Sequence, residues 1–284
     1  MRATASLSQS TGPFLHSRDY KKGIDRIARS VRYRLTREER ILQFVLIHGG
    51  WHDGSGWDGV AGHLRGAGHE VVAPTLNGHG HGVDKTGMTH AGCTGGVVDL
   101  IRDSGLTDVI LVGHSYGGSI IQKVAEAVPD RLRRLVFYNA FVLLDGQCLL
   151  DENPPHYRAL VDHLLSESPD DSFTLPFEVC REAFFNSVDF GAARELWETH
   201  FSPQPAQPFR DKLDLKAFFD LDLPRSYLNC TEDIALPPGP ETGWHPRMSN
   251  RLGLYRLVQM AGDHEALLTS PGLLAEKLIE AGRD

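Results

Sequence analysis

A serine stands between two glycines in the stretch Gly113–Gly117 (GHSYG), directly after the apolar run Val109–Val112. The spacing G-x-S-x-G, with a strand before it and a helix after it, is typical of a sharp turn that raises a serine hydroxyl above the edge of a sheet. Such a turn strains the serine backbone, and the glycines leave space where helix and strand pack closely. Ser115 could instead be an idle residue in a strand–helix connection, but its setting favours a nucleophile.

A serine nucleophile needs a base that takes its proton. The stretch Leu257–His264 indicates a strand followed by a glycine-bearing loop that ends in a histidine. Because this histidine follows the last predicted strand, and because the order serine, acid, histidine recurs in enzymes with this turn, we predict that His264 is the base for Ser115.

The acid that orients His264 should follow the penultimate strand. Asp233 ends the stretch Asn229–Asp233 (NCTED) and is the leading candidate. Glu232 is the adjacent alternative, and Asp145, after the preceding strand, is another. Asp263 is unsuitable, because the side chains of chain neighbours cannot easily turn toward each other.

Two backbone N–H groups are expected to hold the negative oxygen that forms when the serine attacks a carbonyl. One is the N–H of Gly50, in the stretch His48–Trp51 (HGGW) at the end of the first strand, and the other is the N–H of Tyr116. The glycines of the first stretch also suit a tight turn, and the two roles are compatible. Three further residues are predicted to contact the substrate: Trp51, His114 and Trp197.

These residues fall at the ends of strands in a chain that alternates between strand and helix. Strands are predicted at 42–47, 70–73, 109–112, 135–141, 226–230 and 255–260, and helices at 57–67, 97–103, 115–128 and 273–281. Buried parallel strands are continuously apolar, and crossovers between them are right-handed. The pattern therefore predicts an α/β fold with a doubly wound, mostly parallel sheet.

The alternation stops between about residues 145 and 222. Short helical stretches at 157–165, 177–185 and 192–200 are separated by prolines there. We interpret this segment as a helical cap inserted into one domain, residues 41–284. Its aromatic residues, which include Trp197, are expected to form the core of the cap and part of a cleft.

Residues 1–40 differ in composition from the rest of the chain. They hold ten Lys or Arg and four acidic residues, which leaves 19 basic and 33 acidic residues in 41–284. We expect a basic N-terminal arm that is mobile. No run of about 18 apolar residues and no secretory leader is found, so the predicted compartment is the cytoplasm.

Charge and cysteine content narrow the classes of partner. A net charge of −8 over 284 residues disfavours nucleic acid, whose phosphates require basic clusters. The four cysteines are widely spaced and predict reduced thiols. His79, His81 and Asp84 lie close together in the sequence, as the ligands of a metal ion can. We assign them to a loop at the pocket entrance and not to a metal site. The expected partner is a small molecule and not a membrane. Formation of a homodimer is possible.

The motifs together resemble those of the α/β-hydrolases related to plant methylesterases and hydroxynitrile lyases. They are HGGWxxGxxW at 48–57, APTLxGHG at 73–80, GHSYGG at 113–118, CTED at 230–233 and GxHxALL at 262–268. The resemblance covers about residues 41–284 and implies the α/β-hydrolase fold with a Ser-His-Asp triad. The lyases carry a lysine directly after the histidine, whereas Glu265 stands here, which disfavours cyanohydrin cleavage.

The resemblance implies a serine hydrolase that cleaves a small, aromatic ester, carbamate or amide without a metal or organic cofactor. The stretch Asn139–Tyr157 is similar to bacterial enzymes that hydrolyse benzimidazole carbamates such as carbendazim. Two alternatives stay open: a receptor-like hydrolase fold that binds its ligand with little turnover, and a lyase that uses the same triad.

Overall fold

A computed structural model describes residues 41–284. The predicted mobile arm, residues 1–40, lies outside the described residues. The described part contains a parallel sheet of six strands in the order β2-β1-β3-β4-β7-β8. The strands are β1 (Gln43–Ile47), β2 (Glu70–Val72), β3 (Val109–His114), β4 (Leu132–Tyr138), β7 (Arg225–Cys230) and β8 (Arg256–Met260). The doubly wound α/β fold expected from the sequence is confirmed.

Alternate side chains of each strand point to opposite faces of the sheet, and each face has its own apolar core. In β1, Val45 and Ile47 belong to one core, and Phe44 and Leu46 belong to the other. All four side chains are buried. This burial on both faces explains why the strand is continuously apolar in sequence.

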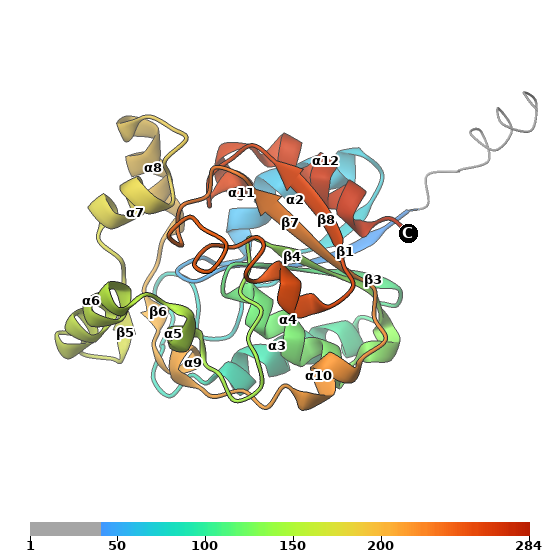
Figure 1. The fold of residues 1–284 in the computed structure, drawn as a ribbon, viewed down its shortest axis with the longest axis horizontal. Helices are drawn as coiled ribbons and strands as arrows, with labels where there is room; N and C mark the ends of the chain where they lie inside the picture. The colour runs from blue at the N-terminus through green and yellow to red at the C-terminus, as the bar shows by residue number, and fades with distance from the viewer. Residues whose placement is uncertain (1–40) are drawn as a thin grey trace, which may run out of the picture. The chain divides into compact units, whose positions relative to one another are not determined.

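Helices cover both faces of the sheet (Figure 1). On one side lie α3 (His90–Asp103), α4 (Gly117–Ala127) and α10 (Lys216–Asp220), and on the other lie α2 (Asp58–Gly66), α11 (Ala266–Thr269) and α12 (Pro271–Gly282). The described part also contains three short 3-10 helices: η1 (Gly54–Trp57), η2 (Pro129–Arg131) and η3 (Ser249–Leu252). Within residues 41–284, none of the helices combines the length and the apolar character that crossing a bilayer requires.

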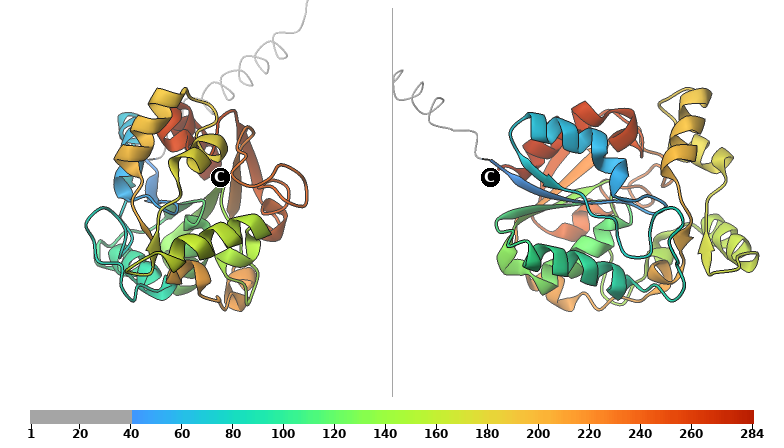
Figure 2. Two further views of the ribbon diagram at one scale, coloured as in Figure 1. Left: turned by 90° about the vertical axis from the view of Figure 1, so that its left-hand side faces the viewer. Right: turned by 180° about the vertical axis from the view of Figure 1, so that it is seen from behind.

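The cap lies between β4 and β7 in the chain. Its elements before α10 are α5 (Leu149–Glu152), α6 (Pro155–Ser166), α7 (Phe177–Ala183), α8 (Phe190–His200), α9 (Gln207–Arg210) and the two-stranded antiparallel pair β5 (Ser172–Phe173) and β6 (Gln204–Pro205). The helices α6, α7 and α8 extend beyond the carboxyl ends of the strands (Figures 1 and 2). Parallel sheets bind ligands at this edge, so the cap covers the edge where a site is expected.

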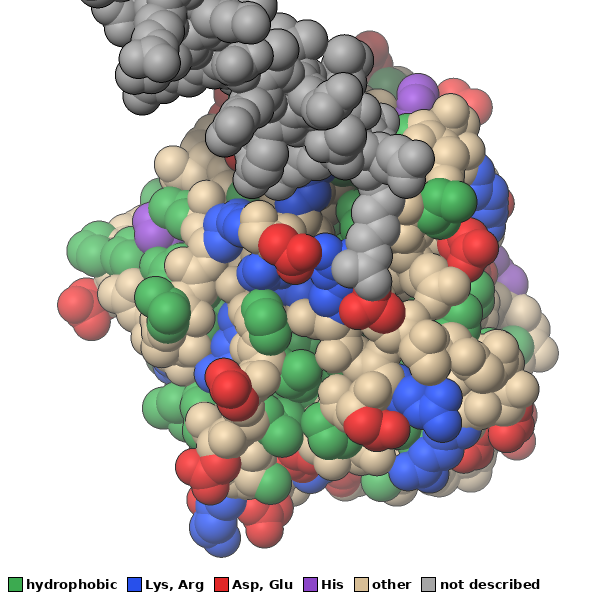
Figure 3. All heavy atoms as spheres, turned by 90° about the vertical axis from the view of Figure 1, so that its right-hand side faces the viewer, with side chains coloured by type: hydrophobic (Ala, Val, Ile, Leu, Met, Phe, Trp, Pro, Cys, Tyr) green, Lys and Arg blue, Asp and Glu red, His purple; other side chains and the backbone are tan. Residues whose placement is uncertain are grey.

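Arginines lie at the opposite edge, where the strands begin. Arg133 and Arg134 are in β4, while Arg225 and Arg256 begin β7 and β8. Basic side chains gather on this face of the molecule (Figure 3). Arg225 donates to the backbone oxygens of Phe218, Leu221 and Leu252, so it joins α10 and η3 to the sheet.

Two elements differ by three residues or more from the sequence-based boundaries. The helix α3 begins at His90, seven residues before the predicted start, because Thr89 caps it by accepting the N–H of Gly92. The strand β4 begins three residues early and ends at Tyr138. Asn139 therefore leaves the sheet at its carboxyl edge, with a φ of 35°.

Candidate active site

Ser115 occupies a sharp turn between β3 and α4. Its φ is 51°, in the left-handed region that side chains other than glycine rarely adopt. A Cβ on Gly113 would lie 2.5 Å from the carbonyl oxygen of Gly117, and one on Gly117 would lie 2.8 Å from that of His48. Both positions therefore require glycine, and this close packing holds the serine in its strained conformation.

His264 lies in the loop after β8, beside the carboxylate of Asp233 in the loop after β7. The distance from Nδ1 of His264 to Oδ2 of Asp233 is 2.6 Å, and both residues are buried. Burial opposes protonation of His264, but the adjacent Asp233 carboxylate outweighs it and raises the histidine pKa above its ordinary value of 6.5. With the Nδ1 proton donated to Asp233, Nε2 is left to accept a proton.

The other acids considered from the sequence are engaged elsewhere. Asp145 accepts the N–H of Leu215, 2.9 Å away, directly before α10. Asp263 accepts hydrogen bonds from Ser187, whose Oγ is 2.6 Å away, and from Oγ1 of Thr269. The side chain of Glu232 is exposed to solvent, whereas the imidazole of His264 is buried. The structure thus brings only Asp233 to the imidazole.

Asn139 completes the setting of Asp233 and was not identified from the sequence. Its Nδ2 donates to Oδ2 of Asp233, and its Oδ1 accepts the N–H of Cys230 at 2.8 Å. The other carboxylate oxygen of Asp233 accepts the N–H of Ala235 at 2.8 Å. These bonds fix the orientation of the carboxylate. Asparagine adopts the left-handed backbone conformation more readily than most residues. An asparagine at the end of a predicted strand is therefore the one feature of the sequence that could have pointed to Asn139.

Ser115 and His264 both line one cavity beneath the cap. Its empty space is about 540 Å³, part of which opens to solvent. The other lining residues are mainly apolar or aromatic: Gly50, Trp51, Tyr116, Phe141, Leu149, Asn153, Tyr157, Val161, Leu175, Phe184, Phe209, Ala235, Leu236 and Trp244. The lining contains no Asp, Glu, Lys or Arg, so the cavity suits an uncharged molecule.

Aromatic rings enclose the imidazole of His264 within this cavity. The ring of Phe184 lies with its centroid 4.9 Å from that of the imidazole, and the ring of Trp244 stacks on it as well. Phe184 comes from the cap and Trp244 from the long loop between β7 and β8. The cap and this loop therefore both restrict the orientation of the imidazole.

The two predicted oxyanion donors lie at the expected places. Gly50 follows β1 and Tyr116 precedes the first residue of α4, and both line the cavity. In residues 41–284, neither backbone N–H donates to another backbone carbonyl. Both groups therefore remain available to an oxygen in the cavity, and that of Tyr116 lies at the positive end of a helix.

Of the three predicted substrate contacts, only Trp51 lines the cavity. His114 is fully buried behind it, where its Nε2 donates to the backbone oxygen of His264 at 3.0 Å. Burial lowers the pKa of His114, so it supports the His264 loop as a neutral ring. Trp197 packs inside the cap against Phe177, with ring centroids 5.8 Å apart, and does not line the cavity.

Glu265 also points away from the cavity. Its Oε2 lies 3.1 Å from Nε2 of His52, and both side chains are buried. His79 is likewise held inside the protein, with Nδ1 3.0 Å from the carbonyl oxygen of Asn77. Among residues 41–284, no group of three or more His, Cys, Asp or Glu side chains is placed to hold a metal ion.

Comparison with known proteins supplies a family context for this geometry. Residues 44–277 match the model of the alpha/beta hydrolase family. The chain is 42% identical to a carbendazim hydrolyzing esterase from Nocardioides sp. (strain SG-4G), over 85% of this chain and 100% of that protein. It is 27% identical to salicylic acid-binding protein 2 from Nicotiana tabacum, over 84% of this chain and 95% of that protein.

Among solved structures, one similar to this chain is an extracellular alpha/beta-hydrolase from a Paenibacillus species. That structure is described as sharing structural and functional homology with tobacco salicylic acid binding protein 2. It is 43% identical and covers 86% of this chain and 100% of its own, with a TM-score of 0.82.

Proposed function

Because the chain belongs to the alpha/beta hydrolase family, we propose that it is a serine hydrolase that cleaves a small, uncharged aromatic ester or carbamate. The observation that carries this proposal is that Ser115 and His264, the latter paired with Asp233, line one apolar cavity. The same arrangement would accept an amide, but esters and carbamates agree with the names of the hydrolytic relatives.

The first half of the reaction forms a covalent bond to Ser115. Its Oγ attacks the carbonyl carbon while Nε2 of His264 takes the hydroxyl proton. The carbonyl oxygen becomes an oxyanion, which the N–H groups of Gly50 and Tyr116 stabilise. When the tetrahedral intermediate collapses, His264 returns the proton to the leaving alcohol or amine, and an acyl or carbamoyl group remains on Ser115.

Water completes the reaction in the second half. His264 takes a proton from water, whose oxygen attacks the same carbonyl carbon. The bond to Oγ of Ser115 then breaks and the serine recovers a proton from His264. Throughout both halves, Asp233 stays ionised and stabilises the protonated imidazole.

The cavity lining supports the substrate class. Aromatic side chains from both the core and the cap, including Trp51 and Phe209, provide flat apolar surfaces. Asn153 and Tyr157 add polar groups on the cap side. The relative named for carbendazim hydrolysis supports an aromatic carbamate as a substrate, and another, a pyrethroid hydrolase of Sphingobium wenxiniae that is 26% identical over 84% of this chain, supports an ester.

The test is turnover by wild type and by Ser115→Ala. Release of p-nitrophenol from short acyl esters, and of product from carbendazim, should continue over many equivalents in the wild type. The alanine variant should lose at least about 1,000-fold in kcat. Equal rates in the two proteins would overturn the proposal, and release that stops after one equivalent would favour a binding protein.

A further inference from the structure

The loop that carries Gly50 is fastened to the cap by backbone and side-chain hydrogen bonds. The N–H of Trp51 donates to Oε1 of Gln204 at 3.1 Å. The carbonyl oxygen of the same Trp51 accepts the N–H of Ser202 at 2.7 Å. Both partners belong to the segment that returns from α8 to the core, so residues about 150 positions away in the chain set the conformation of this loop.

Gln204 is a buried side chain whose hydrogen-bonding groups are committed. Besides the N–H of Trp51, its Oε1 accepts from Nε2 of His79 at 3.1 Å. Its Nε2 donates to the carbonyl oxygen of Pro205 at 3.0 Å. The side chain is fully buried. An amide with both ends engaged cannot turn without leaving buried groups unpaired, so the acceptor that faces Trp51 is fixed.

Burial lowers the pKa of His79 to about 4, so this ring is neutral near pH 7. A neutral ring carries one N–H, and the contact with Oε1 of Gln204 requires that proton on Nε2. Nδ1 then has no proton to donate to the carbonyl oxygen of Asn77, 3.0 Å away. The Gln204 contact therefore depends on this tautomer of the neutral ring.

Fixing the N–H of Trp51 matters because of the residues on either side of that peptide. Gly50 has no Cβ and its own backbone angles are weakly restricted. Trp51 has a φ of 64°, a conformation that costs free energy and that its surroundings must impose. Phe209 blocks one side, since a Cβ on Gly50 would lie 2.9 Å from its ring. Gln204 supplies the hydrogen bond that sets the peptide plane.

We propose that Gln204 is a positioning residue for the oxyanion hole. By accepting the N–H of Trp51 it fixes the peptide that follows Gly50. With that end held, Gly50 keeps its own N–H, which belongs to the preceding peptide, directed toward the oxygen that becomes charged. The inference rests on the function proposed above. Its chemical consequence is confined to the tetrahedral state, because the ground-state substrate gains little from that N–H.

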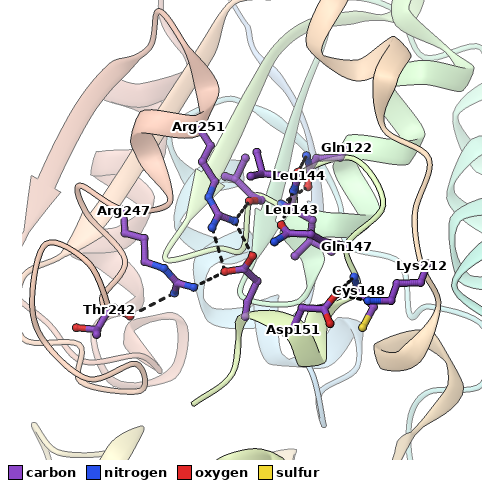
Figure 4. Close-up of polar contacts among 12 residues, drawn as sticks. Gln122, Leu143, Leu144, Gln147, Cys148, Asp151, Lys212, Thr242, Arg247 and Arg251 are labelled. Carbon is purple, nitrogen blue, oxygen red and sulfur yellow. Dashed lines mark hydrogen bonds and ion pairs between the residues drawn. The ribbon is translucent and has the colours of Figure 1, made fainter. Parts of the chain in front are cut away.

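The experiment compares Gln204→Met with a matched control, Gln122→Met. Gln122 is also fully buried, and its amide bonds the backbone N–H and carbonyl of Leu143 at 2.9 and 3.0 Å (Figure 4). Each variant loses buried hydrogen bonds of the glutamine amide, so both should be destabilised. Only the first change touches the loop that carries Gly50.

For a p-nitrophenyl ester, Gln204→Met should lower kcat by about 10- to 100-fold, less than the loss of a whole oxyanion donor, and KM should change by less than about twofold. A trifluoromethyl ketone adds Oγ of Ser115 and forms an oxyanion, so its affinity should fall by about the same factor as kcat. Gln122→Met should keep the kcat of the wild type, and Gln204→Glu, which retains an acceptor at the same reach, should recover most of it.

The proposal is overturned if Gln204→Met keeps kcat within twofold of wild type, if Gln122→Met loses as much, or if the loss falls on KM. Should the methionine variant not fold, Gln204→Asn keeps an amide but withdraws it from Trp51, and the same split between kcat and KM applies. The proposed hydrolase activity is tested separately, by comparing the rates of the wild type and Ser115→Ala.

Discussion

The indole of Trp244 lies almost parallel to the imidazole of His264, with ring centroids 5.3 Å apart and 13° between their planes. An aromatic face stabilises a cation stacked on it, and His264 becomes a cation when it takes the proton of Ser115. We therefore expect Trp244→Leu to lower kcat by about 10-fold and to lower the apparent pKa of His264.

Trp244→Phe keeps an aromatic face and is the matched control for this prediction. The pH dependence of kcat/KM measures the apparent pKa directly. A leucine variant with the profile of the wild type would show that the stacked ring serves packing alone.

Replacement of Asp233 by Asn should change both the rate and its pH dependence. Neutral His264 is the active base, so activity falls as the pH drops through the histidine pKa, which lies above 6.5 in the wild type. Without the carboxylate, Asp233→Asn should move this midpoint to lower pH, and the altered tautomer should reduce kcat by about 10,000-fold. Rates from pH 5 to 9 on an activated ester provide the test, and an unmoved midpoint would contradict it.

Asn139→Ala should reduce kcat with little effect on KM. The change removes the donor to Oδ2 of Asp233 and the acceptor for the N–H of Cys230. We expect about a 10-fold loss, comparable to the effect of removing a hydrogen-bond partner from a metal-binding side chain. Asn139→Asp tests the same contact in a second way, because it places a second carboxylate beside Asp233. At pH 8 its kcat should be lower than that of Asn139→Ala. Equal activity of both variants and the wild type would remove Asn139 from the site.

The strain at Ser115 predicts a difference in stability between two inactive variants. At a φ of 51°, glycine avoids the steric cost that alanine bears, and part of this gain is offset by the greater freedom of glycine in the unfolded chain. Ser115→Gly should therefore be more stable than Ser115→Ala by about 1 kcal/mol. Urea unfolding at pH 7 measures the difference. A more stable alanine variant would mean that the turn is not strained.

Glu152→Gln should destabilise the protein and widen the cavity. The buried Glu152 carboxylate binds both Arg247 and Arg251, with Oε1 2.9 Å from Nη1 of Arg251 (Figure 4). This cluster joins α5 of the cap to the loop that bears Trp244. Removing the charge of Glu152 should lower the free energy of unfolding by about 2–4 kcal/mol. The partial exposure of both arginines limits the cost, because water can solvate their charges.

The neighbouring Asp151→Asn is the control for Glu152→Gln. The Asp151 carboxylate accepts the N–H of Cys148 at the start of α5 and pairs with the exposed Lys212. We therefore expect Asp151→Asn to lower the free energy of unfolding by about 1 kcal/mol or less. Urea unfolding of both variants, together with KM for a bulky aromatic ester, separates the two carboxylates. Equal stability of the two variants would contradict the prediction.

The fold could be predicted because local signals agreed with the global arrangement. Apolar strands such as 109–112, and glycines at turns that exclude a Cβ, placed Ser115 and His264 at the correct edge of the sheet. Asp233 came from the same argument, since it follows a strand at that edge. These residues are placed by the chain segments next to them.

Other residues of the site depend on contacts between distant segments, which a single sequence does not encode visibly. Gln204 acts on a loop about 150 positions earlier, and Trp244 meets His264 only because the loop between β7 and β8 folds back over it. His114, which is predicted from the sequence to contact the substrate, lies outside the cavity lining. The turn directs it to the other side, since successive side chains of β3 alternate between faces.

The cap is attached unevenly. Near α7 it is tied to the loops of both the acid and the base, through Asn186 to Glu232 and through Ser187 to Asp263. In residues 41–284, α6 forms no side-chain hydrogen bond or ion pair with the sheet or with those loops, although its Tyr157 and Val161 line the cavity. Mutation can therefore reshape one wall through α6 while the reactive groups keep their geometry, so substrate range is free to diverge without redesign of the chemistry.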